Sequence, residues 1–339
     1  MTAGSPWSGV AVVVPCRNEA GTIGQVVADF LAALPGCTVV VADNGSTDGT
    51  TEAALAAGAR VLQEHRPGKG MAVRRLLADV DADCYLLVDG DATYDATAAP
   101  ALVERVLVHG MDMVNGTRLT PEHQLEAYRR GHRLGNDVLS WIFRRLFELP
   151  LTDTLTGYRA FSRRFVKSFP ASSEGFEIEA ELNAHAALLD VRVDEVETTY
   201  VSRPEGSVSK LNTYRDGVRI LRRNLRLFRD ARPLLSFSLL ASPWLLATAL
   251  LLVLPVSDYV ATGLVAHFPS LIAGVGTFLV ALNLWAAGVV LERTSRNRVE
   301  VVRLRYLALP APAGLVARAD VPPRAGGVEV AGAVGDPRP

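Results

Sequence analysis

Two carboxylates, Asp89 and Asp91, stand on either side of Gly90 directly after an apolar run at residues 85–88. Such a run is typical of a buried strand, and open α/β sheets bind their ligands beyond the carboxyl ends of the strands. Two carboxylates at that edge can hold Mg²⁺ or Mn²⁺, and the metal can bridge the oxygens of a diphosphate. A similar acidic cluster at residues 79–83 precedes the strand, so it is interpreted as a turn at the opposite edge.

A second polar segment, residues 43–50 (DNGSTDGT), also follows an apolar run. Its small residues allow the backbone to approach a ligand closely, and Asp43 can accept hydrogen bonds from a nucleobase edge. An EF-hand is excluded, because counting from Asn44 places Leu55 where the bidentate glutamate should stand. A plain turn with a helix cap remains the alternative for this segment taken alone.

Strand-like and helical stretches alternate over the first 115 residues, and these elements are expected to position the two polar segments described above. The alternation predicts a mostly parallel sheet covered by helices on both faces. Strands are predicted at Val10–Val14, Val39–Ala42, Tyr85–Val88, Met111–Val114 and Val191–Val201, and Tyr158–Phe161 is a further short segment with no assigned type. Helices are predicted near Thr22–Leu34, Thr50–Ala57, Lys69–Ala78, Ala96–Val108, Glu122–Phe147 and Phe176–Leu189.

The charge of the chain is balanced overall but divided along its length. The 339 residues carry a formal net charge of −1, and 49% of them are apolar. Residues 1–202 hold 18 basic and 27 acidic side chains, whereas residues 203–339 hold 17 and 9. The balanced total argues against a generally basic nucleic-acid binder, and the apolar content argues against a disordered chain. The three cysteines lie in or beside apolar runs and are expected to be buried thiols.

Two uncharged apolar runs, residues 234–254 and 271–291, predict a membrane hairpin. Each run would be about 31 Å long as a helix, close to the ~30 Å hydrocarbon core. Basic residues flank both runs on their outer sides, so positive-inside reasoning places both termini and the first half of the chain in the cytoplasm, at the inner membrane. Ser238, Ser242 and the neighbouring helix could satisfy backbone groups freed by Pro243. Two buried core helices are the alternative.

These patterns divide the chain into five parts. Residues 211–232 are expected to form a juxtamembrane amphipathic helix, whose arginine stripe would bind anionic membrane lipids. A merely solvated charged face is the alternative. The expected parts are a disordered N-terminus at 1–9, a catalytic domain at 10–210, this helix, a hairpin at 233–292, and a cytoplasmic basic flank with a disordered tail at 293–339.

A set of motifs in a fixed order resembles glycosyltransferase family 2, in the branch of dolichol-phosphate mannose synthases and bacterial polyprenyl-phosphate glycosyltransferases. The resemblance covers residues 9–232 and implies a GT-A fold, a Rossmann-like α/β domain. It also implies a nucleotide-sugar donor, a divalent metal, and inverting transfer of one hexosyl residue to polyprenyl phosphate. The motifs are VVVPCRNE, DNGSTDGT, PGKG, DGD, NGTR, DTLTGYRAFSRR and RPEGSVSKLNTYRDG.

The resemblance also assigns residues to roles. Asp89 and Asp91 would hold Mg²⁺ or Mn²⁺ and the diphosphate, but the glutamine expected two residues later is Thr93, so the third metal ligand is open between Thr93 and Asp95. The donor would be bound by Pro15, Arg17, Glu19, Asp43, Lys69, Gly70 and Asp89. Donor or acceptor phosphates would be bound by Arg118, Arg133, Arg203 and Lys210.

The acceptor chemistry can be argued from charge. A lipid monophosphate has a second pKa of about 6, is mostly dianionic at neutral pH, and needs little help from a general base. We therefore interpret Asp153 as a group that orients the cations or the acceptor, and expect Asp91, Asp153 and Arg118 to carry the transfer. Glu177 and Glu179, at a predicted helix start, are expected to pair with arginine.

Other functions remain open. Transfer to a lipid or soluble hydroxyl would need a base near the sugar, for which Asp153 is the candidate. A processive synthase is disfavoured, because the chain lacks a Q-x-x-R-W string and has only two predicted spans. A non-catalytic membrane scaffold with a nucleotide-sugar fold belongs to a different class. The sugar, the choice between UDP and GDP, the polyprenol length and homo-oligomerisation are not determined by the sequence.

Overall fold

A computed structural model describes residues 5–119, 151–154, 156–175, 177–199, 228–230 and 232–312. Its strands are β1 (Val10–Cys16), β2 (Thr38–Asp43), β3 (Arg60–Gln63), β4 (Cys84–Leu87), β5 (Met113–Leu119), β6 (Arg159–Ser162) and β7 (Val193–Thr199). Its helices are α1 (Ala20–Ala33), α2 (Thr50–Ala56), α3 (Lys69–Asp79), the 3₁₀ turn η1 (Ala96–Ala98), α4 (Ala99–Leu107), α6 (Arg163–Ser168), α7 (Ile178–Leu189), α9 (Pro233–Thr262) and α10 (Phe268–Leu307).

The strands form one sheet in the order β3-β2-β1-β4-β6-β5-β7. Strands β1 to β4 are parallel, and β6 is antiparallel to both of its neighbours, β4 and β5. Because Cys16 lies opposite Asp43 in the register, β1 and β2 end at the same edge. The pairing through β6 brings the end of β5 to that edge as well.

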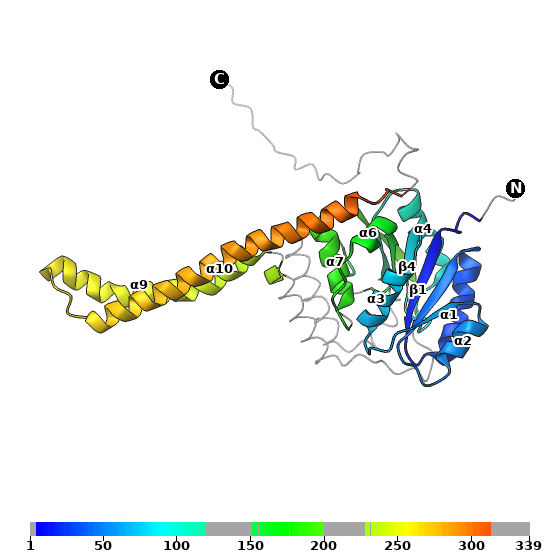
Figure 1. Cartoon of the computed structure of the whole chain (residues 1–339), viewed down its shortest axis with the longest axis horizontal. Helices are drawn as coiled ribbons and strands as arrows, with labels where there is room; N and C mark the ends of the chain where they lie inside the picture. The colour runs from blue at the N-terminus through cyan, green and yellow to red at the C-terminus, as the bar shows by residue number, and fades with distance from the viewer. Residues whose placement is uncertain are drawn as a thin grey trace, which may run out of the picture.

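Helices cover both faces of this sheet, as Figure 1 shows. Alternate residues of β1 explain why: Val12 packs with α1 and α4 on one face, and Val13 packs with α3, α6 and α7 on the other. Continuous apolar runs in β1, β2 and β4 are therefore buried on both sides. The predicted α/β class with a mostly parallel sheet is confirmed, and all three cysteines are buried.

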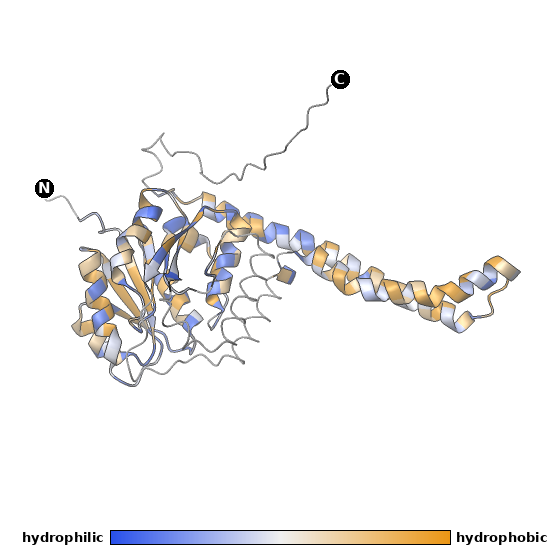
Figure 2. Cartoon of the chain, turned by 180° about the vertical axis from the view of Figure 1, so that it is seen from behind, coloured by the Kyte–Doolittle hydropathy of each residue, from blue (hydrophilic) through white to orange (hydrophobic). Residues whose placement is uncertain are grey.

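Helices α9 and α10 form an antiparallel hairpin that extends from the sheet domain as a long arm (Figure 1). Both helices are long and apolar enough to cross a membrane, and hydrophobic residues predominate along the arm (Figure 2). Many of their large apolar side chains are exposed. The helices meet through small residues at seven-residue spacing, which permits close backbone approach. These are Ala241, Thr248 and Pro255 on α9, and Gly274, Ala281 and Gly288 on α10.

Two prolines interrupt the backbone hydrogen bonds of α9, and serine side chains replace the missing donors. The carbonyl oxygen of Leu239, which would have paired with residue 243, accepts from Ser242 Oγ at 2.8 Å. The carbonyl oxygen of Leu251 accepts from Ser270 Oγ of α10 at 2.6 Å. The role expected for Ser242 is confirmed, and the neighbouring helix supplies the donor at the second site.

The structure departs from the sequence-based elements in four places. Strand β3 and helix α6 were not predicted, and the helix predicted at 96–108 is divided into η1 and α4. The boundary at residue 292 falls within α10, which continues to Leu307. The expected helix at 122–147, nearly all of the juxtamembrane helix at 211–232, and the tail from residue 313 lie outside the described residues.

Candidate active site

The loops that follow β1 and β2 interlock through side chains. Asn18 accepts from the Thr47 amide at 2.9 Å, and Ser46 Oγ accepts from the Asn18 amide at 2.9 Å. Thr50 Oγ1 accepts from the Glu19 amide at 2.8 Å. Asn18 adopts a left-handed conformation (φ 51°), which is uncommon for a non-glycine residue and is typical of built functional loops. The two loops therefore form one preorganised surface at the sheet edge.

Asp43 is buried in that surface. One of its oxygens accepts from the Ser46 amide at 2.8 Å, and the other accepts from the Thr51 hydroxyl. Burial raises the pKa of Asp43, but these hydrogen bonds outweigh it, so its pKa lies below the ordinary value. An ionised carboxylate has about four acceptor directions. Asp43 can therefore accept hydrogen bonds from a nucleobase in addition to those of its own loop.

Asp89 and Asp91 follow β4 at the same edge. Asp91 is buried, and its Oδ1 accepts from the Thr93 hydroxyl at 2.6 Å, which orients the carboxylate. Asp95 caps η1, where its Oδ1 accepts from the amide and hydroxyl of Thr97. Ala92 between them has φ 56°, a second left-handed residue beside the site.

Lys69, the first residue of α3, joins two carboxylates from distant parts of the chain. Its ammonium lies 2.6 Å from Asp89 Oδ1 and 2.8 Å from Glu179 Oε1. Burial lowers the pKa of Lys69, but the two carboxylates outweigh it, so its pKa is raised and the side chain stays charged. The sequence-based expectation that Glu179 pairs with arginine is wrong: its partner is this lysine.

The loop at residues 171–175 covers the PGKG segment, residues 67–70. A Cβ at Gly68 or Gly70 would overlap the backbone of Ser173 and Glu174, so glycine is required for this approach. Gly68 also has φ 132°. Glu181 shapes the covering loop, because its carboxylate accepts from the amides of residues 172 and 173. The backbone on both sides of Lys69, at Gly68 and Gly70, is therefore packed closely against the covering loop.

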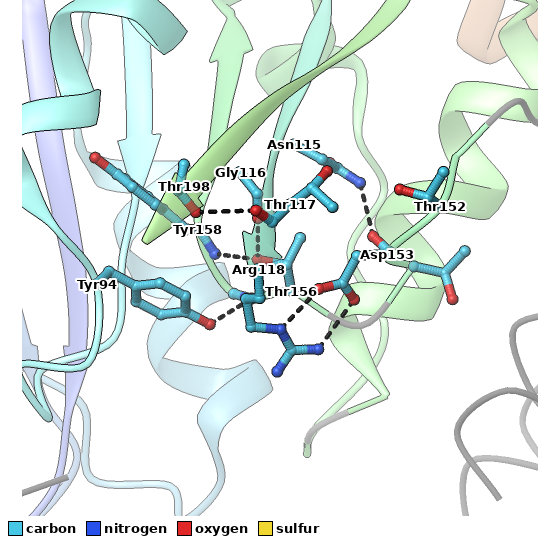
Figure 3. A network of polar contacts seen from close by, with 12 residues as sticks. Tyr94, Asn115, Gly116, Thr117, Arg118, Thr152, Asp153, Thr156, Tyr158 and Thr198 are labelled. Carbon is cyan, nitrogen blue, oxygen red and sulfur yellow. Dashed lines mark hydrogen bonds and ion pairs between the residues drawn. The ribbon is translucent and has the colours of Figure 1, made fainter. Parts of the chain in front are cut away.

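Arg118 and Asp153 form a bidentate ion pair near the end of β5 (Figure 3). Arg118 Nε donates to Asp153 Oδ2 at 2.7 Å, and Nη2 donates to Oδ1 at 2.9 Å. The Asn115 side chain donates to the Asp153 carbonyl oxygen at 3.1 Å. Tyr94 Oη accepts from the Gly157 amide at 3.0 Å in the same network.

Arg159, fully buried in β6, fixes the segment that carries Asp153. Its guanidinium donates to the carbonyl oxygens of Thr154 and Thr156 and to the Asn183 side chain. Burial lowers the pKa of Arg159 to about 10, so it remains charged at neutral pH. Sequence analysis did not single out Arg159 or Tyr94; an arginine within the apolar run YRAF was the available signal.

The structure brings most sequence-predicted residues to one edge. Pro15 is buried, Arg17 is exposed, and Glu19 accepts from Cys16 Sγ at 2.9 Å next to Gly90. Those described at this edge are Pro15, Arg17, Glu19, Asp43, Lys69, Gly70, Asp89, Asp91, Thr93, Asp95, Arg118 and Asp153. Arg133, Arg203 and Lys210 lie outside the described residues.

The donor atoms at the end of β4 suit a hard divalent cation. Carboxylate oxygens are preferred ligands of Mg²⁺ and Mn²⁺, and both metals commonly complete their coordination with water and substrate phosphates. Within the described part of the chain, no group of three or more Asp, Glu, His or Cys side chains could hold a metal ion. Asp89 and Asp91 supply carboxylate oxygens of the kind that such a cation prefers.

The mostly parallel sheet, with acidic and basic groups at its carboxyl edge, has the architecture of GT-A glycosyltransferases, and comparison with known proteins supports that class. Residues 11–169 match the model of "Glycosyl transferase family 2". The chain is 38% identical over 224 residues to "Glycosyltransferase AglJ" of Haloferax volcanii, covering 66% of this chain and 72% of the relative. The chain belongs to glycosyltransferase family 2 and is an enzyme of that family.

Two further proteins are similar to the chain. A "Dolichyl-phosphate hexose transferase" of Haloferax volcanii is 31% identical over 211 residues, covering 62% of this chain and 90% of the relative. The glucosyl-3-phosphoglycerate synthase of Mycobacterium tuberculosis, solved with Mg²⁺ and uridine diphosphate, superimposes with a TM-score of 0.52 at 25% identity, covering 63% of this chain and 78% of that one.

Proposed function

We propose that the chain transfers one hexosyl residue, with inversion, from a nucleotide sugar to polyprenyl phosphate at the cytoplasmic face of the inner membrane. The observation that carries this proposal is the Lys69–Asp89 pair at the sheet edge, in a chain that also has an exposed apolar hairpin. The dolichyl-phosphate hexose transferase relative supports the acceptor class. Neighbours solved with uridine diphosphate support a nucleotide donor.

The donor would lie along the edge formed by β1, β2 and β4. Asp43 would accept from the base, and Pro15, Arg17 and Glu19 would line the nucleoside pocket. Lys69 and Gly70 would approach the diphosphate, with Glu179 holding the lysine in place. UDP and GDP both remain candidate carriers.

Asp89 and Asp91 would hold Mg²⁺ or Mn²⁺, with Thr93 orienting Asp91. A divalent cation bound there would stabilise the negative charge of the departing nucleoside diphosphate. The protein's own contribution is positional: Thr93 holds Asp91, and Lys69 neutralises charge at the same edge.

The acceptor phosphate would be met by cations. Arg118 is described at the edge, and Arg133, Arg203 and Lys210 are proposed to join it. Asp153 is bound on both oxygens by Arg118, which suits a group that orients a phosphate-binding guanidinium. A general base for a hydroxyl acceptor would need to release that pair, so the phosphate acceptor is favoured over a lipid or soluble hydroxyl.

The hairpin would place this site beside its substrate. Both helices would span the bilayer, with both chain termini in the cytoplasm, and the basic segment at 211–232 would bind anionic lipids. Because the apolar side chains are exposed along the arm, they need a hydrophobic environment that an isolated soluble protein lacks.

The test is a panel of radiolabelled nucleotide sugars offered to membranes that contain the full chain and undecaprenyl or decaprenyl phosphate. We expect one donor to give a glycolipid that depends on divalent metal. Asp91→Ala should abolish it, whereas Asp81→Ala, in the acidic cluster at the opposite edge, should not. Nucleotide binding without turnover for every donor would instead support a non-catalytic scaffold.

A further inference from the structure

Helix α10 continues well beyond its apolar part. The uncharged run ends at Leu291, and the helix goes on through residues 292–307. At 1.5 Å per residue this extension is about 24 Å long. It carries five arginines and two glutamates between residues 292 and 305, so it is suited to water and not to hydrocarbon. Crossing a bilayer does not require it.

The extension ends in a polar contact with the catalytic domain. Tyr306 Oη donates to Asp112 Oδ2 at 2.7 Å. Arg164 of α6 donates to both oxygens of Asp112, at 2.7 and 2.9 Å, and its guanidinium stacks on the Tyr306 ring at 4.6 Å from the centroid. Ser162 Oγ donates to Asp112 Oδ1 at 2.7 Å. Asp112 is only 1% exposed, and four donated hydrogen bonds satisfy its carboxylate.

This contact joins residues 194 positions apart in the sequence. Along α10, the extension packs on α6 and also on α7, whose first turn carries Glu179 (Figure 1). The other end of the extension contacts the first turn of α9, because Glu292 Oε2 accepts a hydrogen bond from the Leu234 amide. The extension is therefore fixed to the hairpin at one end and to the sheet domain at the other.

A single strand connects this contact to the active site. Asp112 immediately precedes β5, and Arg118 lies near its other end, paired with Asp153. Six residues of strand span about 20 Å. Strand β5 is paired on both sides, with β6 and β7, so it cannot bend independently of the sheet. The position of Tyr306 on the sheet domain thus determines where Arg118 stands relative to the hairpin.

We propose that Tyr306 and Asp112 are positioning residues that dock the α10 extension on the catalytic domain and hold the active site at a fixed height and tilt over the bilayer. The inference rests on the proposed membrane hairpin and lipid phosphate acceptor. A lipid phosphate cannot leave the interface, so the site has to meet it at a set height. A soluble nucleotide sugar reaches the site from any direction. Docking should therefore matter for the acceptor and not for the donor.

The test compares Tyr306→Phe, Asp112→Asn and the control Asp81→Asn in the full chain in lipid nanodiscs. Asp81 forms a bidentate pair with Arg163, next to Arg164 in the chain, and is not one of the residues described above at the Tyr306 contact. Losing a hydrogen bond to a charged group should lower the equilibrium constant for docking about tenfold or more. Hydrogen exchange should then accelerate in residues 292–307 in the two docking variants and remain unchanged in the control and in β1.

Steady-state kinetics in the same nanodiscs supplies the second readout. We expect the KM for polyprenyl phosphate to rise several-fold in Tyr306→Phe, while the KM for the nucleotide sugar stays constant. Unchanged exchange in residues 292–307 would overturn the docking. Faster exchange with an unchanged acceptor KM, or a parallel rise of both KM values, would overturn the positioning role. If no glycolipid forms with any donor, the proposed function fails, and exchange alone still decides the docking.

Discussion

The substitution Asp153→Asn distinguishes two possible roles of Asp153, a carboxylate that positions Arg118 and a general base. Asparagine has nearly the same shape but carries no charge, so it can accept only one of the two hydrogen bonds that Arg118 now donates, at 2.7 and 2.9 Å. The Asp153 carbonyl oxygen, which accepts from Asn115, is unaffected by the change. The variant therefore loosens the guanidinium without removing the segment that holds it.

The expected loss follows from the geometry of the pair. Both side chains are largely buried, with 23% of Arg118 and 12% of Asp153 exposed, so solvent screens the pair only weakly. Losing one charge-assisted hydrogen bond costs about 2 kcal/mol, which corresponds to about a 30-fold loss in kcat/KM when the whole cost falls on the transition state. Removing a general base typically costs 10²–10⁴-fold, and it also removes the ionisation of that base from the pH profile.

The assay measures glycolipid formation between pH 5 and 9 for the wild type, Asp153→Asn, Arg118→Gln and the double variant. We expect the acidic limb near the second pKa of the acceptor phosphate, at about 6, to persist in every variant. The losses of the two single variants should not add, because both break the same pair. A loss beyond 10³-fold in Asp153→Asn with a flat pH profile would refute the positioning role and favour a hydroxyl acceptor.

Three further changes test other parts of the site. Lys69→Met leaves the partly exposed Asp89 and the buried Glu179 without their shared cation, so calorimetric titration should show at least about tenfold weaker nucleotide binding; unchanged affinity would exclude Lys69 from the donor site. Gly70→Ala should lower the free energy of unfolding by about 1–3 kcal/mol through overlap with the covering loop, whereas Gly21→Ala, with open space around it, should not. Burial lowers the pKa of His185 to about 4, so its neutral form stabilises the fold fully above pH 6.5 and this contribution, about 3 kcal/mol, is lost as the pH falls toward 4. The free energy of unfolding of His185→Gln, measured by denaturation, should therefore fall less than that of the wild type between pH 6.5 and 4. Identical pH dependences in the two proteins would contradict this explanation.

The carboxyl edge of the sheet was predictable because its strands are buried on both faces. Runs such as residues 10–14 and 85–88 are continuously apolar, and a polar residue directly after each run marks where the strand leaves the core. Strand β3 escaped prediction because its four residues, RVLQ, are all at least partly exposed, so they lack both an apolar run and a clear alternation. Helix α6, with six residues, is too short to show helical periodicity.

The polar contacts within the site depended on tertiary structure. Glu179 pairs with Lys69, which lies 110 positions earlier in the sequence. The sequence favoured an arginine as its partner, because Glu179 stands at a helix start near several arginines. Arg159 is buried among carbonyl oxygens of its own preceding loop, a use of arginine that no spacing indicates. The charged residues after Leu291 indicated where a membrane span would end. They did not indicate that the helix continues past that point to Tyr306.

The chemical identity of the product tests the proposed function most directly. The full chain in membranes would receive its labelled donor, Mg²⁺ and polyprenyl phosphate, and the lipid fraction would be analysed by mass spectrometry. We expect a single hexose linked to the lipid phosphate, absent with a chelator and absent for Asp91→Ala. A hexose found on a hydroxyl group, or a metal-independent product, would contradict the proposed function.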